Sequence, residues 1–171
     1  MQLSLSRVYE DVFLEDPKEN PDAPRWRVDF SDEAIEGYVA KVAAALDRTP
    51  DLERQMAAAK SDGERDEGAR SLARLYKRVI TAFIGPEGYD ALLSWMGGGE
   101  RITEERYTMQ LGEVFAAFLT MLGRHASREQ LLACGEYYSG LAPKVAAANR
   151  GGGRKRRKGH GHLKAVQGSR S

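Results

Sequence analysis

The N-terminal part of the chain alternates between apolar and polar residues, a pattern that is typical of β-strands. In the stretch RWRVDF, Trp26, Val28 and Phe30 fall on one face and charged residues on the other. The earlier stretch LSLSRVYEDVFL also favours a strand. A polar run with three prolines separates the two stretches and predicts a loop. We therefore expect two or three strands in a small antiparallel sheet packed on helices, because a hairpin alone is only marginally stable.

From residue 31 onward, apolar residues recur every three or four positions, which predicts amphipathic helices. Ser31 is an N-cap residue, and the two acidic residues after it suit the positive end of a helix dipole. We expect this helix to end near Arg48 and the next to begin with Thr49 as its cap and Pro50 in its first turn. The apolar positions of the first helix are Ile35, Tyr38, Val39, Val42 and Leu46.

The following segment has apolar periodicity at both ends and a polar centre. Residues 61–68, SDGERDEG, include two glycines and fit either a solvated helix or a loop. The stretch Gly85-Pro86-Glu87-Gly88 predicts a helix end, and a short helix should follow up to Met96. Gly97-Gly98-Gly99 predicts a turn and not a phosphate-binding loop, since no strand leads into it and no Lys-Ser/Thr pair follows.

Two further helix starts follow that turn. Thr103 should cap a long helix, and Ser127 with Gln130 forms a capping-box pair that should open the last one. The long helix carries a strong apolar stripe of Leu111, Val114, Phe115, Phe118 and Leu122. We expect a mainly α fold, a helical bundle with a small N-terminal antiparallel β element. Residues 1–149 should form the β element and helical body, and residues 150–171 a disordered, flexible basic tail rich in glycine.

Charge is divided unevenly between these two parts. The tail holds eight of the 26 Lys and Arg residues and none of the 25 Asp and Glu residues. The body therefore has 18 basic and 25 acidic groups, a net charge of −7, against +8 in the tail. The overall charge of +1 is thus the sum of a negative body and a positive tail, whose electrostatic potentials have opposite signs.

The basic run in the tail admits several interpretations. It would attract any polyanion through counterion release, but it has no interleaved aromatic residue to stack on bases. A solvated tail, or one that meets an acidic protein surface, is the favoured interpretation. His160 and His162 are too few for a closed zinc site, and the adjacent cations would repel a metal ion. The candidate polyanion contacts are Arg154, Lys155, Arg156, Arg157 and Lys158.

The sequence offers little support for catalysis, so we expect no enzyme, no cofactor and no metal. Cys134, the single cysteine, cannot form an intramolecular disulfide and lies in an apolar run typical of a buried thiol. His125 stands at the C-terminal end of a predicted helix, where a cation is favourable. No apolar stretch approaches the roughly 20 residues of a membrane span. We also find no secretory signal, and we expect an intracellular protein without a membrane partner.

Aromatic and apolar residues in the short helix and near residue 137 are candidates for a partner surface, with core packing as the alternative. Trp95 lies beside a glycine break and could be an exposed anchor. The candidates are Tyr89, Trp95, Met96, Tyr137 and Tyr138.

The order of elements over residues 25–125 resembles the tail assembly chaperones of long-tailed, siphovirus-like bacteriophages. A small β element, RWRVDF, runs into the capped helix SDEAIEGYVAKVAAAL. The stretches YKRVITAFIGPEGYDALLSWMGGG and ERITEERYTMQLGEVFAAFLTML supply a helix, a glycine-containing junction, a short helix and a long helix. The proline-rich loop at residues 15–24 and the polar insert at residues 61–68 depart from that pattern.

This resemblance implies a protein-binding role. Such chaperones bind the tape measure protein, keep it soluble and help recruit tail tube protein during tail morphogenesis. They act in the cytoplasm of the bacterial host and are absent from the mature virion, and many also occur in a longer form made by translational frameshift. The resemblance identifies no contact residue, and self-association remains open.

Two other functions compete with this prediction. One is a small nucleic-acid-associated protein that acts through the basic tail, although a body of net charge −7 repels phosphate. The other is a different phage structural protein, such as a head–tail connector. Gene neighbourhood and a slippery heptamer around codons 150–160 would distinguish the chaperone from both.

Overall fold

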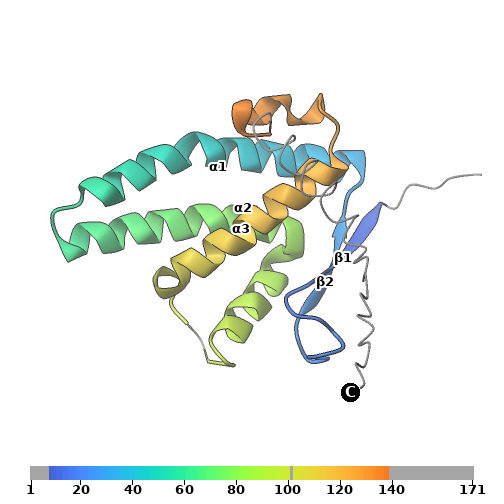
Figure 1. Cartoon of the computed structure of the whole chain (residues 1–171), viewed down its shortest axis with the longest axis horizontal. Coiled ribbons are helices and arrows are strands. Elements are labelled where there is room, and N and C mark those ends of the chain that lie inside the picture. Colours follow the sequence, from blue (N-terminus) through green and yellow to red (C-terminus); the bar gives the residue numbers. More distant parts are fainter. Residues whose placement is uncertain (1–7, 101, 139–171) are drawn as a thin grey trace, which may run out of the picture.

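The computed structural model describes residues 8–100 and 102–138 and confirms a mainly helical fold with an N-terminal antiparallel hairpin (Figure 1). The basic tail at residues 150–171 lies outside the described residues. In chain order the elements are β1 (Tyr9–Phe13), β2 (Arg25–Asp29), α1 (Asp32–Ala58), α2 (Asp62–Met96), the short 3₁₀ helix η1 (Glu104–Tyr107), α3 (Thr108–His125) and the 3₁₀ helix η2 (Gln130–Cys134).

The hairpin pairs β1 with β2 so that Glu10 faces Val28 and Val12 faces Trp26. Val28 is fully buried and Trp26 is partly buried, as the alternation predicted for this face. On the opposite, solvated face Arg27 Nε lies 3.0 Å from Asp11 Oδ1. The described part of the chain thus contains two of the two or three strands expected.

Helix α1 begins as predicted but does not end where predicted. The Ala34 N–H donates to Ser31 Oγ at 3.3 Å, which confirms the N-cap. The predicted break at Thr49-Pro50 is wrong, because α1 continues to Ala58. The Thr49 hydroxyl donates to the carbonyl of Ala45 at 2.8 Å and therefore caps nothing. Packing beyond the proline outweighs the lost backbone hydrogen bond, since Leu52 is buried.

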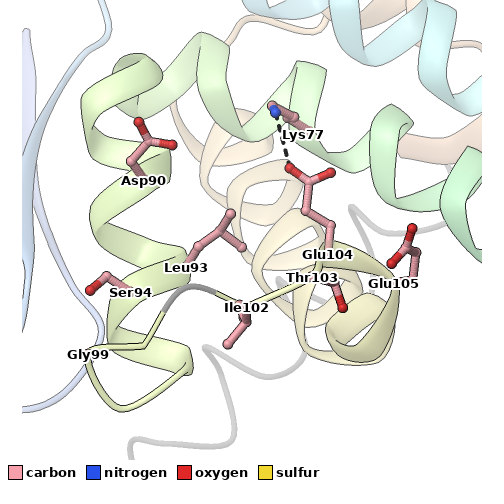
Figure 2. Close-up of a pocket in the computed structure, with 9 residues that line it drawn as sticks. All are labelled: Lys77, Asp90, Leu93, Ser94, Gly99, Ile102, Thr103, Glu104 and Glu105. Carbon is pink, nitrogen blue, oxygen red and sulfur yellow. Dashed lines mark hydrogen bonds and ion pairs between the residues drawn. The ribbon is translucent and has the colours of Figure 1, made fainter.

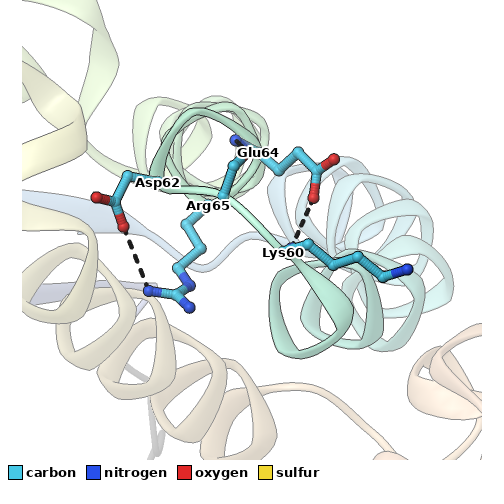
Figure 3. Close-up of polar contacts among 5 residues, drawn as sticks. Lys60, Asp62, Glu64 and Arg65 are labelled. Atoms are coloured by element: carbon cyan, nitrogen blue, oxygen red, sulfur yellow. Dashed lines mark hydrogen bonds and ion pairs between the residues drawn. The ribbon is translucent and has the colours of Figure 1, made fainter.

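The polar insert at residues 61–68, which the pattern left undecided, is helical. Helix α2 starts at Asp62, where Ser61 Oγ accepts from the Glu64 N–H at 3.2 Å. The Glu64 carboxylate accepts in turn from the backbone N–H of Lys60 at 2.7 Å (Figure 3). Arg65 lies 3.4 Å from Asp62 on the same turn (Figure 3). These contacts close the tip of a long antiparallel pair formed by α1 and α2 (Figure 1).

Helix α2 changes direction at Gly85, where φ is +77° and ψ is 167°. This conformation is open to glycine and strained for other residues. The break predicted at Gly85-Pro86 is therefore confirmed, and a second segment of α2 runs from Pro86 to Met96 beside the hairpin (Figure 1). Trp26 of β2 packs on this segment so closely that a Cβ at Gly88 would lie 2.9 Å from the indole nitrogen. The predicted glycine turn follows, with φ of +66° at Gly98 and +91° at Gly99.

The core lies where α3 packs across α1 and α2. An aromatic stack joins the three helices: the Tyr38 and Phe83 ring centroids are 4.1 Å apart, and those of Phe83 and Phe118 are 4.7 Å apart. The stripe predicted for α3 is largely buried, at Leu111, Phe115, Phe118 and Leu122, with Val114 partly buried.

The two helix starts predicted around α3 have different outcomes. Thr103 precedes the 3₁₀ helix η1 and makes no side-chain capping hydrogen bond. Ser127 and Gln130 form the predicted reciprocal pair, at 3.1 and 2.8 Å, but they open the 3₁₀ helix η2 and not an α-helix. Among the described residues, no helix combines the length and apolarity needed to cross a membrane.

Candidate functional site

The structure separates the five residues predicted for a partner surface. Trp95, Met96 and Tyr137 are partly buried and reach the surface. Tyr89 and Tyr138 are only 1% and 8% exposed, so both are core residues and leave the predicted surface. The apolar pattern could not distinguish these cases, because a tyrosine on the inner face of a helix looks the same in sequence as one on an interface.

Tyr89 is buried because the Gly85 kink turns this part of α2 against η1. The Lys77 ammonium lies 5.2 Å from the centre of its ring. Burial, together with the negative charge of Glu104, raises the pKa of Tyr89 well above the ordinary value for a tyrosine. The ring is therefore a neutral structural element that supports the adjacent surface.

Tyr138 fastens the chain after η2 to α3. Its hydroxyl donates to the carbonyl of Leu119 at 2.8 Å, and its ring covers Gly123. Burial raises the pKa of Tyr138, so the donor keeps its proton. Tyr137 packs edge-on against this ring at 5.1 Å and remains partly exposed.

Trp95 lies on the wall of a groove of about 670 Å³ that we name the tryptophan groove. The Trp95 indole N–H donates to Glu15 Oε1 at 3.3 Å, a contact between residues 80 positions apart. This bond ties the proline-rich loop to the second segment of α2. The groove is lined by Glu15, Pro24, Ala91, Ser94, Trp95, Gly98 and Gly99.

A second groove, of about 680 Å³, lies on the other side of the same segment and is named here the acidic groove (Figure 2). Lys77 Nζ lies 3.0 Å from Glu104 Oε1, and Arg70 Nε lies 3.0 Å from Glu105 Oε1. Its lining consists of Lys77, Asp90, Leu93, Ser94, Gly99, Ile102, Thr103, Glu104 and Glu105. Ser94 and Gly99 line both grooves, so the two hollows adjoin.

A third groove, of about 250 Å³, lies between the hairpin and α3, and we name it the hairpin groove. The Phe13 side chain stands 45% exposed at this groove, and Glu113 is its one charged lining residue. Sequence reasoning missed this site, although an aromatic residue on the polar face of a strand was a usable signal. The lining is Val12, Phe13, Leu14, Trp26, Glu113, Val114, Ala117, Phe118 and Met121.

The histidine and the cysteine of the described body have structural surroundings. His125 ends α3, stacks on Phe30 with ring centroids 3.9 Å apart and pairs with Glu10 of β1. Arg124 lies 3.5 Å from the same carboxylate, so the C-terminal end of α3 holds the hairpin. Cys134 is buried, as predicted, and burial raises the pKa of its thiol. A raised pKa disfavours the reactive thiolate.

Across residues 8–100 and 102–138, no group of three or more His, Cys, Asp or Glu side chains is arranged to hold a metal ion. The candidate polyanion contacts Arg154 to Lys158, with His160 and His162, lie outside the described residues. Comparison with protein-family models, with curated proteins and with solved structures found no match.

Proposed function

We propose that this protein is a tail assembly chaperone that binds an apolar helical segment of the phage tape measure protein in its hairpin groove. It would keep that long chain soluble and help bring tail tube protein to it. It would act in the cytoplasm of the bacterial host and be absent from the finished virion. The observation that carries the proposal is an open groove with almost wholly apolar walls on a body of net charge −7.

The chemistry of the groove suits such a partner. An amphipathic helix in water exposes an apolar face, and an apolar groove between secondary-structure elements is a common way to cover one. Phe13 offers an aromatic ring at the surface, and Phe13 and Val114 come from elements about 100 positions apart that the fold holds together. The acidic charge of the rest of the body would keep a loaded complex in solution.

The direct test is co-expression with the tape measure protein encoded in the same genome, followed by affinity capture and a measure of its soluble fraction. The informative variant is Ala117→Glu, because Ala117 is exposed and lines the groove. A carboxylate placed in an apolar contact should lower tape measure capture by about tenfold or more. The matched control is Ala116→Glu, an exposed position on the same helix that does not line the groove.

The outcomes separate the two parts of the proposal. If the wild-type chain neither captures nor solubilises the tape measure protein, the function is wrong. If Ala117→Glu and Ala116→Glu capture the tape measure protein equally well, the function can stand but the hairpin groove is not the binding site. The gene itself offers an independent check: it should lie between the genes for the major tail protein and an unusually long tape measure protein, with a slippery heptamer near codons 150–160.

A further inference from the structure

The acidic charge of the body is concentrated in two short segments. Residues 15–22 carry a net charge of −3 and residues 87–105 a net charge of −4. Together they account for the whole net charge of −7 of residues 1–149, and the rest of the body is balanced. Residues 32–84, which form the long α1–α2 pair, hold ten acidic and nine basic residues, so their net charge is only −1.

The fold brings these two segments to the same place. The Trp95–Glu15 hydrogen bond joins them directly, and both contribute walls to the tryptophan groove. Figure 1 shows the loop between β1 and β2 beside the second segment of α2, and Figure 2 shows Asp90 and Ser94 on that segment. Among the described residues, Glu15 is the one charged side chain that lines the tryptophan groove, and Asp90 lines the adjoining acidic groove.

The walls of the tryptophan groove suit the aliphatic stems of long cationic side chains. Pro24, Ala91 and the partly buried Trp95 ring provide apolar contact for the methylene groups of Arg or Lys. The ring can also attract a guanidinium group to its face. The Glu15 carboxylate on the groove wall would then meet a charged end, within the negative charge of the two acidic segments.

We propose that the tryptophan groove binds the chain's own basic run, Arg154 to Lys158. This run is the strongest concentration of positive charge in the sequence, with five cations in succession and no acidic residue after it. It is separated from Tyr138, the last described residue, by 15 residues. That length can span up to about 50 Å when extended. A tethered segment of this kind reaches an effective concentration in the millimolar range, so weak contacts suffice.

This inference does not depend on the proposed chaperone function. Its consequence is that the tail is shielded from polyanions while it lies on the body. Because the contact is electrostatic and exposed, it should weaken as salt shortens the Debye length from about 30 Å at 0.01 M to about 3 Å at 1 M.

The first test observes Trp95 in the full-length protein by ¹H–¹⁵N NMR. The indole N–H cross-peak of Trp95 is assigned by its absence in Trp95→Phe. Its chemical shift should change between about 0.01 and 1 M salt as the run leaves the groove. In the variant R154Q/R156Q/K158Q the salt-dependent shift should fall by more than half. The control R150Q/K164Q/R170Q removes the same charge from the same tail and should keep most of the shift.

The second test measures the salt needed to elute the full-length protein from immobilised heparin. The variant E15Q removes the carboxylate that lines the tryptophan groove, while its amide oxygen can still accept from the Trp95 indole N–H. It should release the basic run, so the protein should elute at higher salt. The control E53Q makes the same change in net charge at an exposed position of α1 and should elute at lower salt than E15Q.

Several results would overturn the proposal. Equal salt-dependent changes of the Trp95 chemical shift in R154Q/R156Q/K158Q and R150Q/K164Q/R170Q would show that the run does not occupy the groove. Elution of E15Q and E53Q at the same salt concentration would show that the groove carboxylate does not hold the tail. A Trp95 shift that disappears on dilution would place the run on a second copy of the chain and not on its own body.

Discussion

At the residue scale, single polar atoms decide how the last described residues attach to the body. Tyr138 reaches across the surface of α3 to the Leu119 carbonyl, and Gly123 leaves room for its ring. The indole N–H of Trp95, in the second segment of α2, likewise holds the proline-rich loop by donating to Glu15. Each contact joins segments that are distant in sequence, so each limits the freedom of a loop or a chain end.

Replacing Tyr138 by Phe should lower the free energy of unfolding by about 1 kcal/mol, because one buried hydrogen bond is lost with little change in shape. Urea denaturation followed by circular dichroism measures this. Tyr137→Phe is the matched control, since Tyr137 is partly exposed and packs only edge-on against its neighbour. Equal stability of the two variants would show that the Tyr138 hydroxyl does not stabilise the fold.

At the element scale, the two helical prolines have opposite roles. Pro50 lies inside α1, where it removes a backbone hydrogen bond and its ring crowds the preceding turn. Pro86 directly follows the non-helical Gly85 and starts the second segment of α2, where no backbone donor is required. The same residue type is therefore tolerated at a cost in one helix and suits its position in the other.

We expect Pro50→Ala to raise the free energy of unfolding by about 1 kcal/mol or more, because it restores a donor inside a helix. Pro86→Ala should change the free energy of unfolding by less than half as much. It could also lower that free energy slightly, because alanine gives the unfolded chain more conformational entropy than proline does. The urea midpoints of the two variants test this directly. A larger gain for Pro86→Ala would contradict the roles assigned here.

At the scale of the whole molecule, the core holds ionisable groups that stay neutral. Burial raises the pKa of the Cys134 thiol and, with nearby charges, the pKa values of Tyr89 and Tyr138. In the unfolded chain these groups lose protons at their ordinary pKa values, about 8.5 for cysteine and about 10 for tyrosine. At higher pH the unfolded state therefore binds fewer protons than the native state, which lowers stability.

The free energy of unfolding should consequently fall as the pH rises from about 8.5 to 11, and Cys134 should react slowly with a thiol reagent until the protein unfolds. Urea titrations at several pH values measure the first effect. The variant Tyr89→Phe should show a shallower decline with pH, and Tyr9→Phe, at a position 55% exposed, should not. A decline that is identical in both would show that Tyr89 is not responsible.

The hairpin, the capped start of α1, the break at Gly85, the glycine turn and the stripe of α3 could all be predicted from local patterns. The continuity of α1 could not, because a Thr-Pro pair is locally a good helix start and only the packing of Leu52 overrules it. Of the candidate surface residues, Trp95, Met96 and Tyr137 reach the surface, whereas Tyr89 and Tyr138 do not. The burial of Tyr89 depends on the kink at Gly85, and the burial of Tyr138 depends on the packing of the segment after η2 against α3.

The helical class, the hairpin and the division of charge between an acidic body and a basic tail could be predicted from the residues alone. These properties follow from short-range periodicity, capping and composition. The packing of the folded chain determines which aromatic rings are buried, places Phe13 at a groove with α3, and brings two acidic segments together at Trp95. Contacts between residues 80 or more positions apart depend on how helices cross and where a glycine turns the chain, and no local pattern encodes that geometry.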